Sequence, residues 1–222
     1  MKSLIITILF SILAFMSFAQ IDKDQLALDV NKADAANTEL LKSFIWKRQS
    51  VVSIDGAVKL TTITEFSFDE KGDLKAKVID ASTTVKQKSG IRGKMQKNAA
   101  EDKVDYVEKA LGLSLAYTFM SKGELIDFFN KATITENNGI IEATASDIHV
   151  KGDKLTILLD SKTKLYLNKK FSSLLGTDPI SGEIKYDKFN SGINHGSVTI
   201  LNMPAQKMKI DASNIDYSQR VK

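Results

Sequence analysis

One long helical stretch interrupts a chain that is otherwise composed of strand-like segments. Between Ala99 and Ala132, apolar residues recur at steps of three and four, namely Val104, Val107, Leu111, Leu115 and Phe119. This spacing predicts an amphipathic helix whose apolar stripe packs against another element. Because strand-like segments precede and follow it, the stretch favours helices packed on one face of a sheet.

Two capping signals divide this stretch into two helices. Asn98 with Glu101 offers a cap for the first helix, and Ser121 with Glu124 offers a cap for a second, shorter one. Gly112 weakens the first helix by about 1 kcal/mol. Burial of the stripe outweighs this cost, because each large apolar side chain contributes about 1.5 to 3 kcal/mol. The apolar residues of the second helix are Leu125, Ile126, Phe128 and Phe129.

The N-terminus has the features of an export signal. Met1-Lys2 precedes an apolar run from Leu4 to Phe15, and small residues stand three and one positions before a cleavage point that follows Ala19. We therefore predict a signal peptide over 1–19, a single domain over 20–222, and a periplasmic or secreted protein. The sequence contains no cysteine, so we expect neither a disulfide nor lipid attachment at a cysteine, and packing must supply the stability.

The first half of the predicted domain combines a helix with a meander of strands. Apolar residues between Asp22 and Phe44 fall close to one helical face, and strand-like segments follow over 45–54 and 57–68. Asp55-Gly56 between these two segments is a strong hairpin signal. A third strand is expected over 74–81.

Further strand-like segments follow the helical pair at short spacing, with turn residues between them. The expected strands are 140–145, 155–159, 165–171, 183–189, 198–202 and 207–212, and the expected turns are at Asn138-Gly139, Gly152-Asp153, 161–164, Asp178-Pro179, 190–192 and Met203-Pro204. About nine strands and three helices result. We predict an α+β domain in which a curved antiparallel sheet, a half-open barrel, encloses helices.

No catalytic or cofactor-binding constellation is evident. The chain has two histidines and no cysteine, so ordinary zinc or haem ligand patterns cannot be assembled, and no cofactor is expected. His149 and His195 are interpreted as structural or surface residues. Ser161-x-x-Lys164 has the spacing of penicillin-recognising enzymes, but it falls in an expected β-turn. The formal net charge of +4 is too small to indicate a nucleic-acid partner.

A basic segment lies between Thr83 and Lys97. It contains no acidic residue, and its candidate anion-binding residues are Lys86, Lys88, Arg92 and Lys94. We expect a loop. It is either a solvated connection or a peripheral docking site for an anionic membrane surface, where each Lys or Arg contributes about 1 kcal/mol.

Several large apolar residues allow two interpretations. They are Trp46, Phe66, Phe68, Leu115, Phe119, Phe128 and Phe129, with Met120 beside them. They either fill the core of the domain or line an apolar cavity in the concavity of the sheet, where Met and aromatic side chains accommodate acyl chains.

The order of export signal, helix, meander, helical insertion and second meander resembles the LolA-like superfamily, which includes the periplasmic outer-membrane lipoprotein carriers and related stress-regulator domains. Local landmarks are similar to those of an uncharacterised family of exported bacterial proteins: Trp46-Lys47-Arg48, Phe68-Asp69-x-x-Gly72, Ile91-Arg92-Gly93, Gly152-Asp153-x-Leu155, Asp178-Pro179 and Asn214-x-Asp216-Tyr217. The resemblance implies a half-open barrel whose cavity binds apolar or lipid-modified ligands without chemistry. The Arg-Pro segment typical of the carriers is missing, which leaves lipoprotein transfer itself without support.

These observations favour a non-enzymatic exported protein that binds a lipid, an acyl chain or a lipid-modified protein. The alternative is a module that recognises another envelope protein through an exposed strand edge or through the basic segment. A hydrolase of unrecognised type is the third possibility. The oligomeric state is not predicted.

Overall fold

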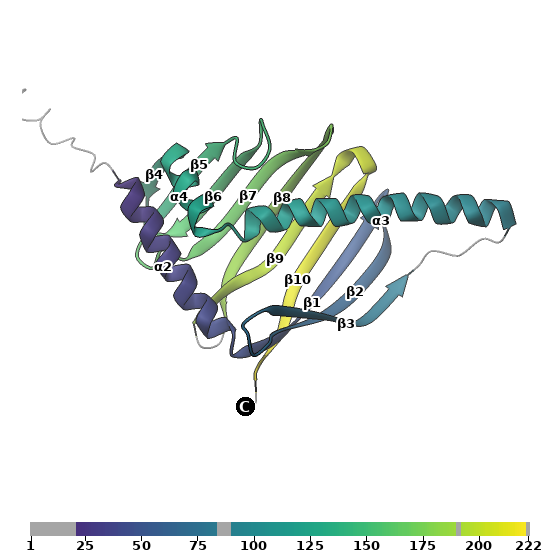
Figure 1. Ribbon diagram of the computed structural model, residues 1–222, viewed down its shortest axis with the longest axis horizontal. Coiled ribbons are helices and arrows are strands. Elements are labelled where there is room, and N and C mark those ends of the chain that lie inside the picture. Colours follow the sequence, from purple (N-terminus) through teal and green to yellow (C-terminus); the bar gives the residue numbers. More distant parts are fainter. Residues whose placement is uncertain (1–20, 84–89, 190–191, 221–222) are drawn as a thin grey trace, which may run out of the picture.

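The protein is a curved, unclosed sheet with helices on one face, as the computed structural model in Figure 1 shows. The structure describes residues 21–83, 90–189 and 192–220, with the backbone alone described over 90–102. Ten antiparallel strands form one sheet in the order β3-β2-β1-β10-β9-β8-β7-β6-β5-β4. β3 and β4 are its two ends, and they do not pair with each other. The predicted signal peptide, 1–19, lies outside the described residues.

The strands form two meanders joined by the helical insertion. Their bounds are β1 Phe44–Ile54, β2 Ala57–Phe68, β3 Leu74–Thr83, β4 Thr133–Asn137, β5 Ile140–Ser146, β6 Lys154–Asp160, β7 Tyr166–Leu175, β8 Asp178–Phe189, β9 Ile193–Met203 and β10 Met208–Gln219. A short 3-10 helix, η1 Pro204–Gln206, connects β9 to β10. The pairing of β1 with β10 joins the first meander to the end of the second, so the two meanders form one continuous sheet.

Three α-helices occur in the described part of the chain: α2 Lys23–Leu41, α3 Gly90–Thr118 and α4 Lys122–Lys131. α2 begins after Asp22, whose side chain accepts a hydrogen bond from the Gln25 amide. α2 packs against α4 and β9, whereas α3 crosses the sheet and packs on β7 and β8 (Figure 1). None of these helices combines the length and the apolar character needed to cross a lipid bilayer.

The main core lies between the helices and the second meander. Leu125, Phe128 and Phe129 of α4 are fully buried there, against strand residues such as Ile157 and Ile184. The capping box predicted for α4 is confirmed, since Ser121 and Glu124 exchange hydrogen bonds. The hairpin at Asp55-Gly56 is also confirmed; both residues have positive φ, as a tight two-residue turn requires.

The predicted orientation of α3 is wrong. Val104, Leu111, Leu115 and Phe119 of the expected apolar stripe are exposed, and only Val107 packs against the core. The face that contacts the sheet instead carries Ala110, Ser114 and Tyr117. Small residues let the helix axis approach the sheet closely, and Tyr117 reaches buried hydrogen-bond partners on it.

The expected start of α3 is also wrong. The helix begins at Gly90, so Asn98 lies inside it and does not cap it. Arg92 and Lys94 therefore belong to the first turns of a helix and not to a loop. Lys86 and Lys88 lie outside the described residues, as do the side chains of Arg92 and Lys94.

Two further details differ from the sequence prediction. The sheet has ten strands because the polar segment Thr133–Asn137 forms an edge strand, β4, that pairs with β5. The turn expected at Asp178-Pro179 lies two residues earlier, at Gly176-Thr177. Pro179 is instead near the start of β8, a position that proline tolerates because a strand end needs fewer ladder hydrogen bonds.

Candidate functional site

A cavity of about 470 Å³ lies between α2, the α3–α4 junction and the sheet. One part of its lining is apolar: Leu41, Phe68, Leu74, Phe119, Met120 and Leu165. The other part is polar: Asp34, Asn37, Thr38, Thr118, Ser121, Glu124, Tyr166, Lys169, Tyr186, Asn194 and His195. The volume is in the range of small-molecule sites, and mixed walls of this kind are typical of them.

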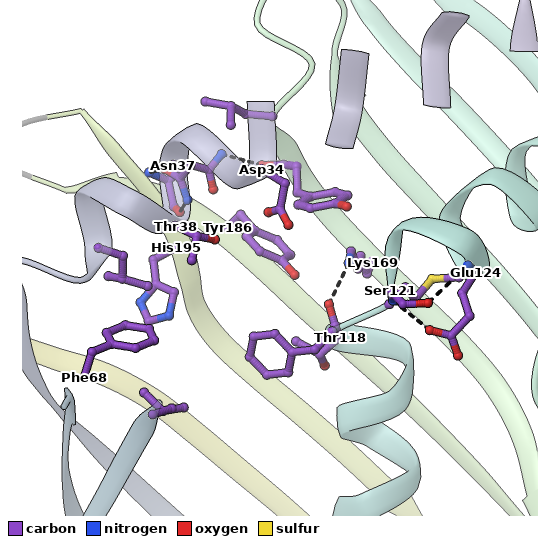
Figure 2. Close-up of a pocket in the computed structure, with 17 residues that line it drawn as sticks. Asp34, Asn37, Thr38, Phe68, Thr118, Ser121, Glu124, Lys169, Tyr186 and His195 are labelled. Carbon is purple, nitrogen blue, oxygen red and sulfur yellow. Dashed lines mark hydrogen bonds between the residues drawn. The ribbon is translucent and has the colours of Figure 1, made fainter. Parts of the chain in front are cut away.

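The wall formed by α2 follows from helical spacing. Asp34, Thr38 and Leu41 recur at steps of four and three, so they share one face of the helix, which looks into the cavity. The opposite wall comes from β7, β8 and β9. Figure 2 shows Asp34 on α2 with Lys169 and Tyr186 on the sheet, and His195 beside Phe68 farther along the cavity.

Lys169 is the least expected residue of this lining. It is only 1% exposed, because it shares the inward face of β7 with Phe171. Its Nζ donates a 2.8 Å hydrogen bond to the carbonyl oxygen of Thr118 and lies 3.9 Å from the ring centroid of Tyr166. Thr118 ends α3, so the ammonium group is placed where the helix dipole is negative.

Burial lowers the pKa of Lys169 to about 8, although the negative charge of Asp34 opposes this shift. The side chain is therefore mostly cationic at pH 7. Burial raises the pKa of the Asp34 carboxyl group, and the charge of Lys169 opposes that shift in turn. The two groups influence each other across the cavity, but they do not form a direct ion pair within the described residues.

Two tyrosines share this polar end. Burial raises the pKa of Tyr166, and the negative charge of Asp34 raises it further. The same two causes raise the pKa of Tyr186. Both phenols therefore remain protonated at neutral pH and can donate hydrogen bonds into the cavity.

Asn194 joins α2 to the sheet beside this polar end. Its backbone amide donates to Asn37 Oδ1 at 2.7 Å, and its carbonyl accepts from Asn37 Nδ2 at 2.6 Å. Its side-chain Nδ2 donates to the carbonyl of Tyr166 at 2.7 Å. Asn194 Oδ1 is buried and has no hydrogen-bond partner among the described residues, which leaves one strong acceptor unused at the cavity wall.

His195 connects the cavity to an aromatic cluster. Its Nδ1 lies 2.6 Å from the hydroxyl of Tyr217, and its ring packs edge-on against Trp46. Burial lowers the pKa of His195 to about 4, with a further contribution from the positive charge of Arg48. The imidazole is therefore neutral at pH 7. The prediction that this histidine is structural is compatible with its contacts, although the residue also lines the cavity.

The apolar residues predicted to bind a ligand fall into three groups. Phe68 and Phe119 line the cavity. Trp46 is 3% exposed and stacks on Phe66, so both support the wall from behind. The remaining three are away from the lining: Leu115 is exposed on α3, and Phe128 and Phe129 are buried in the core.

The polar lining was not anticipated from the sequence. A lysine within a strand usually faces solvent, so the residue type of Lys169 does not indicate a buried site. Its position in the strand does: side chains alternate between the two faces of a strand, and Lys169, Phe171 and Ser173 lie on the buried face of β7, alternating with exposed residues. For Asp34 the signal was its spacing from Leu41 and Val30 on the buried face of α2.

The comparisons with known proteins concern fold only. No family model and no curated protein matches the chain. Seven chains of solved structures match it, among them the following three. A DUF1329 family protein from Desulfovibrio piger is 10% identical, with coverage of 90% of this chain and 92% of that chain and a TM-score of 0.41.

The other two structures carry names from the superfamily that the sequence resembles. A LolA superfamily protein from Nitrosomonas europaea is 10% identical, covers 87% of this chain and 94% of its own, and has a TM-score of 0.40. A domain described as an outer membrane lipoprotein-sorting protein, from Vibrio parahaemolyticus, is 12% identical, covers 90% and 94%, and has a TM-score of 0.47.

Proposed function

We propose that this protein is a non-enzymatic, exported binding protein that holds an apolar ligand, such as a lipid or an acyl chain, in the cavity. The observation that carries the proposal is the apolar wall of that cavity, in which Phe119 exposes 65% of its surface. An exposed phenylalanine beside Phe68, Leu74 and Met120 is stabilised when a ligand removes these surfaces from water, by about 25 cal/mol per Å².

The polar residues of the lining support binding more than catalysis. The lining serine, Ser121, uses its side chain to cap α4, and the adjacent carboxylate, Glu124, completes the same capping box. His195 is directed to Tyr217, and no serine hydroxyl is hydrogen-bonded to it within the described residues. Among the described lining residues, Ser121 and His195 are therefore not arranged as a nucleophile with a base beside it, which a serine hydrolase needs.

Two measurements test the proposal. Protein purified from its native compartment is extracted with organic solvent, and mass spectrometry of the extract is expected to show a stoichiometric lipid. In parallel, binding of the apolar fluorophore N-phenyl-1-naphthylamine is titrated into Phe119→Gln and into a control, Leu28→Gln. Leu28 is an exposed apolar residue of α2 that does not line the cavity.

We expect Phe119→Gln to weaken fluorophore binding about tenfold, which corresponds to about 1.4 kcal/mol, and Leu28→Gln to leave it unchanged. Both substitutions replace an exposed apolar side chain, 65% exposed at Phe119 and 46% at Leu28. A lipid-free native protein, together with equal fluorophore affinity in both variants, would contradict the proposal.

A second function, recognition of another envelope protein, is favoured by β3. This strand is exposed along its whole length and ends the sheet, so a partner strand has an edge to which it can add. Native mass spectrometry separates the two functions. A lipid adduct supports the carrier function, and a lipid-free chain that retains a protein partner supports the second.

Membrane docking by the basic residues remains part of the proposal. Arg92 and Lys94 belong to the N-terminal turns of α3, whose ribbon extends beyond the sheet in Figure 1. Co-sedimentation with vesicles that contain anionic lipid tests the contribution of Lys86, Lys88, Arg92 and Lys94. Binding should fall when all four are replaced by glutamine, and unchanged binding would exclude them as the docking residues.

A further inference from the structure

We infer that the ligand of this cavity has a zwitterionic head group, with its anionic part against Lys169 and its cationic part against Asp34. The inference rests on the proposed function, because it requires the cavity to be a ligand site. It goes further by naming the chemistry of the ligand's polar end.

Lys169 retains capacity for an anionic partner. An ammonium group has three N–H donors, and only the bond to the Thr118 carbonyl is made within the described residues. The group is almost fully buried, yet no carboxylate of the described residues pairs with it directly. A buried cation without a direct counterion is costly, and a ligand oxyanion would remove that cost.

Asp34 retains the complementary capacity. Its carboxylate is half-buried on α2, faces the cavity, and accepts no hydrogen bond from the described residues. The unpartnered oxygen of Asn194 lies on the same side, because Asn194 is hydrogen-bonded to Asn37, one turn beyond Asp34 on α2. A ligand ammonium group would find acceptors in both side chains.

The two opposite charges select against ligands with a single charge. A head group that is only anionic would gain attraction from Lys169 but would meet repulsion from Asp34, and a cationic one would meet the reverse. A zwitterion that lies alongside the two residues, head to tail, gains from both. Figure 2 shows Asp34 on α2 and Lys169 on the sheet, so the two charges come from different elements of the cavity lining.

The same wall positions the rest of the ligand. Tyr166 supplies a phenolic donor near the anionic part, since its ring centroid lies 3.9 Å from Lys169 Nζ, and Tyr186 lines the same cavity. The apolar lining begins beyond them, with Met120, Phe119 and Phe68. The acyl chain therefore extends from the polar end toward these side chains.

Competition experiments test the head group. N-phenyl-1-naphthylamine bound to the full chain is displaced by compounds that share a lauroyl or dodecyl chain. Lauroyl lysophosphatidylethanolamine and N-lauroyl-ornithine are the two zwitterions, with phosphate and carboxylate respectively. Laurate, dodecylamine and monolaurin are the anionic, cationic and uncharged members of the set.

We expect at least one zwitterion to compete about tenfold better than each of the other three compounds. The stronger zwitterion identifies the source of the anionic group, phosphate or carboxylate. Asp34→Asn should abolish the advantage over laurate, and Lys169→Met should abolish the advantage over dodecylamine. Asp24→Asn, an exposed carboxylate on the first turn of α2, is the matched control and should change nothing.

The outcomes separate the inference from the function on which it rests. Equal competition by monolaurin and the zwitterions would overturn the head-group assignment while leaving an apolar ligand in place. Laurate or dodecylamine as the strongest competitor would overturn it as well. If the fluorophore does not bind at all, so that there is nothing to displace, the proposed function itself is overturned. If Lys169→Met does not fold, Asp34→Asn alone tests the inference. This variant is expected to fold, because the Asp34 side chain makes no hydrogen bond with the described residues.

Discussion

The hydroxyl of Tyr117 donates a 2.5 Å hydrogen bond to Asp153 Oδ2 and thereby fastens α3 to the loop between β5 and β6. Asp153 is 1% exposed. Burial alone would raise its pKa, but the Tyr117 hydroxyl and the backbone amides of Ile148, His149 and Val150 stabilise the carboxylate and hold the pKa below its usual value. The orientation of α3 depends on this buried acceptor.

Replacement of Asp153 by alanine should therefore destabilise the fold more than removal of its strongest single donor. We expect Asp153→Ala to lower the free energy of unfolding by about 3 kcal/mol, because four donors lose their partner, and Tyr117→Phe to lower it by about 1 to 2 kcal/mol. Urea denaturation at pH 7 measures both. Equal losses in the two variants would show that the backbone donors contribute nothing.

The buried Lys169 should give the protein an unusual response to alkaline pH. Its pKa is about 8 in the folded chain and 10.5 without burial, so the unfolded state binds more protons between these values. Stability must then rise with pH across this window. Relative to Lys169→Met, the wild type should gain about 2 kcal/mol between pH 7 and pH 9.5. A difference that stays constant with pH would show that Lys169 titrates normally.

Whereas Lys169 makes the stability depend on pH in the alkaline range, His195 should do so in the acidic range. Its pKa of about 4 lies below the ordinary 6.5, so the unfolded state again binds the additional proton and stability falls as pH decreases from 6.5 to 4. Between pH 7 and pH 4, the wild type should lose about 3 kcal/mol more than His195→Gln. The ring protons of His195, followed by NMR, should titrate near pH 4; a midpoint near 6.5 would contradict the prediction.

Gly182 should not tolerate a side chain. A Cβ atom at this position would overlap the ring of Phe171 on the neighbouring strand, whereas a Cβ at Gly112 in α3 meets nothing. We expect Gly182→Ala to destabilise the protein by about 1 to 3 kcal/mol through overpacking. Gly112→Ala should stabilise it by up to about 1 kcal/mol through helix propensity.

A rescue experiment distinguishes the overlap from a general loss of strand stability. Leucine at position 171 removes the ring that Gly182 faces, so the double variant Phe171→Leu, Gly182→Ala should be more stable than the sum of the two single effects predicts. Additive effects in thermal or urea unfolding would place the cause elsewhere.

The parts of the fold that could be predicted are those determined by local signals. Asp55-Gly56 has the conformation that a tight hairpin needs, and Ser121 with Glu124 caps α4, because these preferences act between neighbours in the chain. The face of α3 could not be predicted this way. Its apolar stripe was the stronger hydrophobic pattern, but close packing of Ala110 and Ser114 and the buried partners of Tyr117 determine the orientation.

The same reasoning explains what could be predicted of the candidate site. Phe68 and Phe119 were among the large apolar residues expected to fill the core or to line a cavity, and both are in the lining. Lys169 and Asp34 belong to different elements, and only tertiary structure brings them to one cavity. β4 was missed because an edge strand that is exposed at four of its five residues needs no apolar alternation.

The long helix is held to the sheet by its C-terminal half. Val107, Ala110, Ser114 and Tyr117 of α3 pack on the core or are buried against the sheet, and the hydrogen bonds of Tyr117 and Thr118 lie at the C-terminal end. From Val107 back to Gly90 the helix is about 25 Å long. A tilt of about 10° of the held half would move the N-terminal end by roughly 4 Å over this length. Small adjustments around Met120 would thus be amplified at the far end of the helix.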